Sequence, residues 1–267
     1  MDKAVLYDID DEGIVTLTLN RPDMRNPISD PAVIEGLLGA LDRLENDGAA
    51  RVAILTGAGK GFSSGGNISE MKPGGNVNGG TPIRTRINYK RGIQRLPLAF
   101  AALEVPVIAA VNGAAVGAGC DLTCMCDLRI AGESARFAEN FVKIGLIAGD
   151  GGSWLLPRIV GWSKAAEMAL TGDMIDAAEA LACGLVSKVV PDHELMDSAR
   201  ALARRIAANP SHAVRMTKRL LWESHRGDLA TVLEIAAAMQ AAAHGTQDHA
   251  EAVEAFLQKR PPNFKGA

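Results

Sequence analysis

Apolar and polar positions alternate in two different ways along the chain. Short apolar runs typical of β-strands occupy residues 4–9, 13–19, 51–57, 106–113, 127–131 and 187–190. Helical stretches separate many of these runs, a pattern that predicts a mixed α/β fold with many parallel crossovers. Periodicity alone does not distinguish a Rossmann-like sheet from a spiral of ββα units.

The last part of the chain has only helical periodicity. Asn-Pro, Arg-Gly and His-Gly breaks separate Ala-rich segments at 194–208, 211–224, 228–243 and 247–258. We therefore predict a core domain over residues 1–192 and a helical C-terminal subdomain over 193–267. The segment LATVLEIAAAMQAAA has more apolar positions than a small subdomain can cover, so we expect this subdomain to pack against other subunits.

Composition and charge are those of an ordinary globular protein. Hydrophobic residues make up 48% of the chain, charged residues 22%, and the formal net charge is −3, so neither nucleic acid nor a membrane surface is an expected partner. Apolar runs are interrupted before the roughly 18 residues that a membrane span requires. The first ten residues lack the apolar core of a signal peptide, so a cytoplasmic location is expected.

Cysteine and histidine positions give no metal or triad signal. We expect buried free thiols at Cys120, Cys124, Cys126 and Cys183, because the close cluster lies in an apolar run with no histidine nearby. All five histidines fall in the helical tail, which argues against a Ser-His-Asp triad.

Two glycine-rich turns follow apolar strands. GFSSGGN spans residues 61–67, and NGAAVGAG, residues 112–119, opens a helix. Glycines allow tight turns that leave backbone N–H groups uncovered, and a helix start adds positive potential. Two such turns can each offer one N–H to a single oxygen and so form an oxyanion hole.

Nucleotide binding fits these turns poorly. A P-loop requires Gly five residues before Gly59 and Ser or Thr after Lys60, where the chain has Ile54 and Gly61. The second turn has GxxxGxG spacing rather than the GxGxxG of dinucleotide-binding folds. We therefore expect neither ATP nor a nicotinamide cofactor.

Several ordered blocks resemble the crotonase (enoyl-CoA hydratase/isomerase) superfamily. They are RVAILTGAGKGFSSGGNISEM, VPVIAAVNGAAVGAGCDLTCMCDLRIA, ARFAENFVKIGLIAGDGGSWLLPRIVG and ALTGDMIDAAEALACGLVSKVVP. The resemblance implies a crotonase-like spiral of ββα units with a C-terminal helical subdomain that covers the active site and builds homotrimers or homohexamers. It also implies an acyl-CoA substrate, no other cofactor and no metal. Gly66 and Ala118 would supply the oxyanion-hole N–H groups, and the loop at 71–86 would border the acyl pocket.

The acid positions depart from those of well-known hydratases, which resemble this chain but carry two glutamates. Asp121 stands at the first position and Phe141, which cannot transfer a proton, at the second. Asp121 and Asp150 are therefore the candidate catalytic acids, and Glu139 is an alternative because extended backbone would put it on the same face as Phe141. Capping at Asp121 and turn formation at Asp150 are competing structural roles.

The resemblance also assigns residues to the acyl-CoA molecule itself. Arg25 would lie beside the entry for the pantetheine and phosphates, and the terminal Lys259 and Lys265 would reach the 3′-phosphate, including that of a neighbouring subunit. As exposed cations, all three could equally be solvated charge. The other residues expected around the substrate are Ser64, Asn67, Ile68, Gly117 and Phe141.

The sequence thus predicts an acyl-CoA enzyme of the enoyl-CoA hydratase/isomerase type that stabilises a thioester enolate. Three alternatives remain open: an isomerase without hydratase activity, an acyl-CoA-binding protein with little turnover, and a β-keto acyl-CoA hydrolase. Acyl chain length and pathway are not encoded in any motif.

Overall fold

The core of the molecule is a six-stranded sheet whose strands match the apolar runs of the sequence. The computed structural model describes residues 3–266, and the sheet order is β1-β2-β3-β4-β6-β9. The strands are β1 (Val5–Ile9), β2 (Ile14–Leu19), β3 (Val52–Gly57), β4 (Val107–Val111), β6 (Leu128–Gly132) and β9 (Lys188–Val190). β1 pairs antiparallel with β2 and the other pairs are parallel, so the predicted α/β class is confirmed.

A second, smaller sheet was not anticipated from the sequence. It has the order β5-β7-β8 and contains β5 (Ala114–Val116), β7 (Arg136–Ala138) and β8 (Met174–Asp176). Each strand is three residues long, too short to give a periodic signal. β5 places the second glycine-rich turn beside the first, through the bridge between Ser63 and Ala115.

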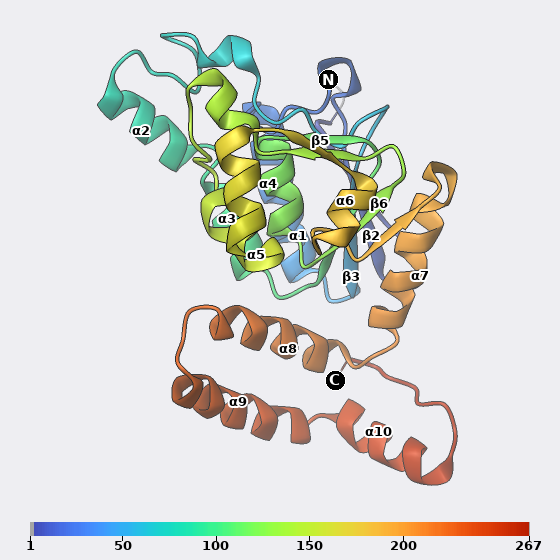
Figure 1. Cartoon of the computed structure of the whole chain (residues 1–267). Helices are drawn as coiled ribbons and strands as arrows, with labels where there is room; N and C mark the ends of the chain where they lie inside the picture. The colour runs from blue at the N-terminus through green and yellow to red at the C-terminus, as the bar shows by residue number, and fades with distance from the viewer. Residues whose placement is uncertain (1–2, 267) are drawn as a thin grey trace.

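Helices cover both faces of the large sheet (Figure 1). The helices of the core are α1 (Pro31–Asn46), α2 (Pro82–Arg91), α3 (Arg95–Ala102), α4 (Ala118–Met125), α5 (Gly152–Thr171), α6 (Ala177–Ala182) and α7 (Leu195–Ala207). Ala53 and Leu55 face one cluster of buried side chains, while Val52 and Ile54 face the other. Burial on both faces explains why the central strands read as continuous apolar runs.

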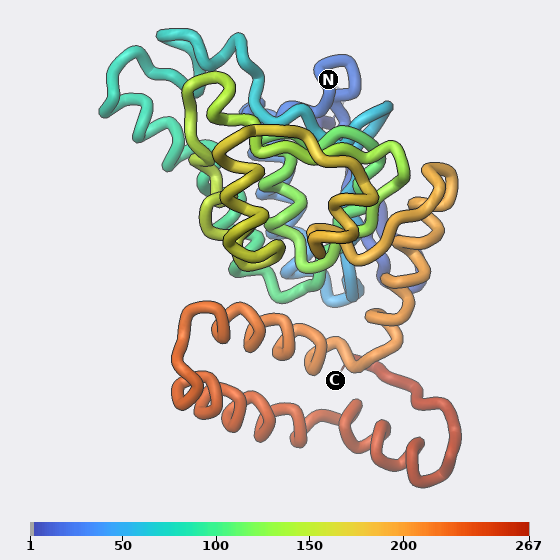
Figure 2. Tube along the Cα trace, viewed as in Figure 1, coloured from blue at the N-terminus to red at the C-terminus, as the bar shows by residue number. Residues whose placement is uncertain are grey.

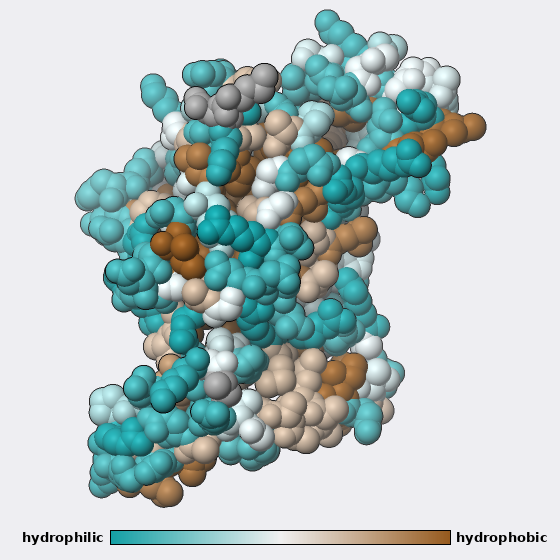
Figure 3. Space-filling view, turned by 180° about the vertical axis from the view of Figure 1, so that it is seen from behind, coloured by the Kyte–Doolittle hydropathy of each residue, from teal (hydrophilic) through white to brown (hydrophobic). Residues whose placement is uncertain are grey.

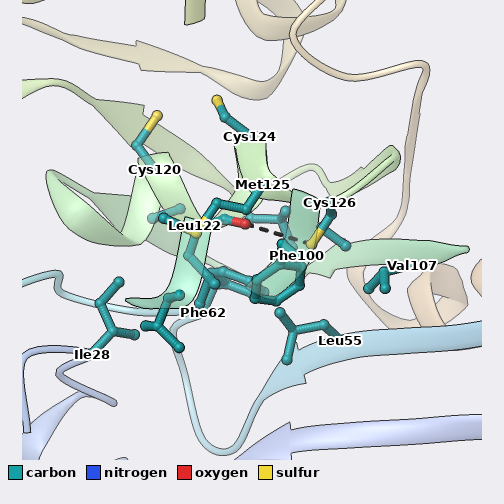
Figure 4. Packing of buried hydrophobic residues seen from close by; sticks show 14 of the residues in the cluster. Ile28, Leu55, Phe62, Phe100, Val107, Cys120, Leu122, Cys124, Met125 and Cys126 are labelled. Atoms are coloured by element: carbon teal, nitrogen blue, oxygen red, sulfur yellow. Dashed lines mark hydrogen bonds between the residues drawn. The ribbon is translucent and has the colours of Figure 1, made fainter. Parts of the chain in front are cut away.

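The helix after the second glycine turn lies inside the core. All eight residues of α4 are buried, including Asp121, and Figure 4 shows its Leu122 and Met125 on the side of Phe62 and Phe100, while Cys120 and Cys124 point away from these rings. The four cysteines are free thiols, and Cys183 alone is only partly buried. The start of α4 is therefore held rigidly by packing.

The C-terminal helices form an arm that projects from the core (Figures 1 and 2). Its helices are α8 (Ser211–Ser224), α9 (Leu229–His244) and α10 (Gln247–Gln258), close to the predicted bounds. α7 lies within the predicted subdomain of 193–267, but it packs on β2, β3, β4 and β6 of the large sheet. Leu195, Ala199 and Ala203 of α7 join the second buried cluster, so the arm begins after Ala207.

Polar and aromatic contacts attach the arm to the core, including the ion pair of Arg215 on α8 with Glu45 on α1 at 3.2 Å. Nζ of the buried Lys218 on α8 lies 2.8 Å from Oδ2 of Asp127 and donates to the Val105 carbonyl at 2.8 Å. The Trp222 ring stacks on the Trp154 ring of α5 with the centroids 5.9 Å apart. These contacts define how the proximal end of the arm sits against the core.

Hydrophobic surface is exposed on the arm, part of which is visible from behind in Figure 3. The exposed large apolar side chains there are Leu221, Leu229, Leu233, Val253, Phe256 and Leu257. Within residues 3–266, no helix is both long and apolar enough to cross a membrane.

Candidate active site

The two glycine-rich turns lie side by side. The Ser63 N–H donates to the Ala114 carbonyl at 3.0 Å, and the Val116 N–H donates to the Ser63 carbonyl at 3.0 Å. Gly65 has a φ of +79°, and a Cβ there would lie 2.2 Å from the Val116 carbonyl oxygen. Only glycine fits that position, so the close approach of the two turns depends on it.

Two backbone N–H groups at this junction are available to a ligand. Neither the Gly66 nor the Ala118 N–H has a protein acceptor among the described residues, and both residues line one cavity of about 280 Å³. Ala118 is the first residue of α4, where a helix has no internal acceptor for its N–H groups and carries partial positive charge. The pair therefore has the composition of an oxyanion hole.

A buried asparagine, which the sequence reasoning missed, fixes the first turn. Nδ2 of Asn26 donates to the carbonyls of Ala58, Gly61 and Phe62 at 3.0, 3.1 and 3.2 Å, and the Ser63 hydroxyl donates to the Asn26 carbonyl at 2.7 Å. Asn26 also has a φ of +54°, a conformation that asparagine tolerates better than most residues. The available signal was an asparagine beside proline in the NRPDMRNP segment.

Apolar and polar residues from several elements complete the cavity wall. Its lining includes Met71 and Val77 from the predicted loop, Tyr89 from α2, Phe141 and Asp150. The segment 71–86 is not all loop, because α2 begins at Pro82. A Cβ on Gly117 would lie 3.6 Å from Cζ of Phe141, so the phenyl ring stands next to the Ala118 end of the donor pair.

Asp150 is the buried carboxyl group in this wall. Its side chain is 2% exposed, and neither carboxyl oxygen has a hydrogen-bond donor. Glu35 also lines the cavity, but it is exposed and paired with Arg95. Burial raises the pKa of Asp150 above its ordinary value, and burial also raises the pKa of the neighbouring Tyr89.

Asp121 lies behind the cavity wall rather than in it. Its side chain is fully buried, and a Cβ on Gly152 would lie 2.0 Å from its Oδ1, so the carboxyl group packs directly on the start of α5. Neither of its oxygens has a hydrogen-bond donor. Asp121 thus shares the site with Asp150, but only Asp150 lines the cavity that contains Gly66 and Ala118.

Glu139 joins the two aspartates in a buried carboxyl cluster, defined here as Asp121, Glu139 and Asp150. Burial raises the pKa of Asp121 well above its ordinary value, and the Glu139 and Asp150 charges raise it further. Burial raises the pKa of Glu139 to about 7, while hydrogen bonding from Asp121 acts in the opposite direction. Of the three acids, Asp121 has its pKa raised well above the ordinary value, and in such a cluster a proton is shared between neighbouring carboxyl groups.

The predicted substrate contacts near the first turn lie at its outer side. The Ser64 N–H donates to the carbonyl of the exposed Arg25 at 2.9 Å. Oδ1 of Asn67 accepts from the Ser69 N–H and hydroxyl at 3.1 and 2.7 Å, so Asn67 bonds within its own turn. Ile68 is exposed. The cavity is lined by none of the predicted residues Arg25, Ser64, Asn67 and Ile68.

The terminal lysines lie on the arm. Lys259 ends α10 in a left-handed conformation, and the Lys265 N–H donates to Asp248 at 2.7 Å. Among the described residues, none of the arm lines the cavity of its own chain. Within one chain, the described part of the arm therefore does not cover this cavity.

Comparisons with known proteins agree with this architecture. A sequence model of the family described as "Enoyl-CoA hydratase/isomerase" matches residues 10–267. The chain is 37% identical to the 1,2-epoxyphenylacetyl-CoA isomerase of Escherichia coli, covering 96% of both chains, and 37% identical to the short-chain-enoyl-CoA hydratase of Clostridium acetobutylicum, covering 94% of both. The crystal structure of an enoyl-CoA hydratase from Bacillus anthracis superimposes with a TM-score of 0.91 at 35% identity, covering 99% of this chain and 100% of that one.

These similarities extend over nearly the whole length of both partners and over the complete fold. The predicted superfamily and its α/β crotonase fold with C-terminal helices are confirmed, and the structure adds the second sheet. The chain belongs to the enoyl-CoA hydratase/isomerase family of acyl-CoA enzymes.

Proposed function

We propose that this protein moves the double bond of an enoyl-CoA thioester, by one-carboxylate chemistry in the cavity beside Gly66 and Ala118. The observation that carries the proposal is the composition of the cavity wall. It has two free N–H donors, one buried carboxyl group, Asp150, and the phenyl ring of Phe141, which the resemblance equates with the second glutamate of hydratases.

In this mechanism the Gly66 and Ala118 N–H groups bind the thioester oxygen. They stabilise the enolate that forms when a proton leaves the α-carbon, and one such donor contributes about 3 kcal/mol to transition-state stabilisation. Asp150 accepts that proton and returns a proton to the γ-carbon. Its raised pKa brings its proton affinity nearer to neutral pH, which suits both steps.

Phe141 disfavours hydration in the same cavity. Adding water at the β-carbon requires one group to hold and activate a water while another moves the proton, and a phenyl ring can do neither.

Arg25, exposed beside the first turn, is proposed to bind the phosphates of coenzyme A. The relative named as an isomerase acts, by its name, on an epoxide thioester, and the relatives named as hydratases make hydration the reaction to test against double-bond migration.

The test compares isomerisation of a 3-enoyl-CoA, followed at the absorbance of the conjugated product, with hydration of crotonyl-CoA. We expect the first reaction to be the faster one and to fall by about 100-fold or more in Asp150→Asn. Asp11→Asn, the same change in an exposed turn, is the matched control. Fast hydration that persists in Asp150→Asn would refute the proposal.

A further inference from the structure

The carboxyl cluster has a second side, away from the cavity of Gly66 and Ala118, which we call the substrate cavity. Glu139 lines a separate cavity of about 220 Å³ together with Gly152, Ser153 and Leu156 of α5. Residues on both sides of the helix kink at Gly161 form its wall, including Pro157 and Ala165. None of the residues lining this second cavity lines the cavity of Gly66 and Ala118.

Asp121 connects the two sides. Its carboxyl group packs on Gly152, a residue of the second cavity wall, and it is next to both Glu139 and Asp150. All three side chains are at most 2% exposed, and five of their six carboxyl oxygens are buried with no hydrogen-bond donor. Buried carboxyl groups that have few hydrogen-bond partners besides one another are costly, so three of them together indicate a role that a simple packing cluster does not explain.

We propose that Asp121 and Glu139 form a proton relay that connects Asp150 to water in the second cavity. The inference rests on the proposed role of Asp150 as the group that takes the α-proton. It adds a route by which that proton leaves the substrate cavity without passing through its mouth, which bound acyl-CoA would fill.

The relay moves one proton out of the substrate cavity and one back in. The C2–H bond of the 3-enoyl-CoA breaks and its proton goes to Asp150, while the electron pair is held in the thioester enolate. Asp150 passes a proton to Asp121 as Asp121 passes its own to Glu139, and Glu139 releases one to water. Reversal of these transfers delivers a solvent proton to C4, so the double bond moves from C3–C4 to C2–C3 with no net change in the enzyme.

Other titratable groups face the cluster and affect the pKa values of its carboxyl groups. The fully buried Cys120 thiol lowers the pKa of Glu139, and the Asp150 charge raises the pKa of Tyr89. Neither group lines the second cavity, so among the described residues Glu139 is the titratable end of the route there.

The first experiment follows isomerisation in D₂O and measures deuterium at C4 by mass spectrometry. With the relay, most wild-type product carries solvent deuterium. In Glu139→Gln the deuterium fraction falls by about threefold or more, because the abstracted proton stays on Asp150 and is returned to the same substrate. Ala166→Leu narrows the second cavity without touching a carboxyl group and should lower the same fraction, while Glu133→Gln on the exposed surface should not.

A second experiment needs no turnover, so it separates the relay from the proposed function. The infrared band of the protonated Asp121 carboxyl, identified by its absence in Asp121→Asn, is followed after transfer into D₂O. We expect its exchange to be slower in Glu139→Gln than in the wild type. Equal exchange rates in the two proteins, or equal deuterium fractions in their products, would overturn the relay. Absence of isomerisation together with slower band exchange would refute the proposed function alone.

Discussion

At the scale of single residues, burial rather than residue type decides what each acid can do. Asp121, Glu139 and Asp150 are all carboxyl groups, but Asp150 lines the substrate cavity, Glu139 lines a second cavity and Asp121 has no exposed surface. Burial raises the pKa of each of them. In such a cluster protons are shared, so each titration belongs to the group of residues rather than to one of them.

Glu139 should make the stability of the protein fall as pH rises. Its pKa is about 7 in the folded chain against an ordinary value of 4.5, so between these values the folded state binds more protons than the unfolded state. Stability from this group is complete below about pH 4.5 and is lost by about pH 7, a change of roughly 3 kcal/mol. Glu139→Gln, which stays neutral, should therefore gain stability relative to the wild type across this range.

Urea unfolding of both proteins at several values between pH 4.5 and 8 measures that difference. Glu133→Gln, an exposed Glu-to-Gln change, controls for the general effect of removing a negative charge. Free energies of unfolding that stay parallel for the wild type and Glu139→Gln over this range would contradict a raised pKa at Glu139.

At the scale of elements, the start of α4 positions the Ala118 N–H group that the proposed mechanism uses. β3 and β5 bring their turns together, and packing of α4 inside the core fixes the Ala118 N–H at the cavity. Most strands and helices of the core follow the sequence pattern, because long apolar runs and capping residues act locally. The second sheet escapes that pattern because its three-residue strands depend on distant partners.

Ala118→Pro should remove one oxyanion donor while leaving the helix intact. Proline is favoured at the first helical position, where its missing N–H has no helical acceptor. Loss of one donor should reduce kcat/KM by about 100-fold, or about 3 kcal/mol. Ala177→Pro places the same change at the first position of α6, whose residues do not line the cavity, and should retain activity.

Circular dichroism shows whether both proline variants fold. A folded Ala118→Pro protein with wild-type kcat/KM would rule out the Ala118 N–H as an oxyanion donor.

At the scale of the whole molecule, the arm has apolar surface that its own chain does not cover. It exposes large apolar side chains and lines no part of the cavity in its own chain. Apolar surface of this kind normally marks an interface. We therefore propose a homotrimer, or a hexamer of two trimers, in which each arm packs on a neighbouring core.

Light scattering at micromolar concentration should give three or six times the 28.0 kDa mass of one chain. Phe256→Asp combined with Leu257→Asp places two charges on exposed apolar positions of the arm and should shift the mass toward smaller species. Glu254→Gln on the same helix is the control. A stable wild-type monomer under these conditions would exclude the trimer.

The sequence by itself determined the strands of the large sheet, the helices of the arm and the two donor turns. Continuous apolar runs specify strands buried on both faces, and glycines such as Gly65 specify where backbone must approach backbone. The resemblance located Gly66, Ala118 and Phe141, all of which the structure brings to one cavity. These features are encoded locally, in residue type and spacing.

Only the tertiary structure decided how the acids are arranged and what the arm covers. Asp121 lies in α4, Glu139 follows β7 and Asp150 precedes α5, and nothing in their spacing indicates that they meet or which one faces the substrate cavity. The arm carries helical periodicity that predicts its helices but not their direction away from the core. Burial and proton affinity arise from packing between elements distant in sequence, and that packing exists only once the chain has folded.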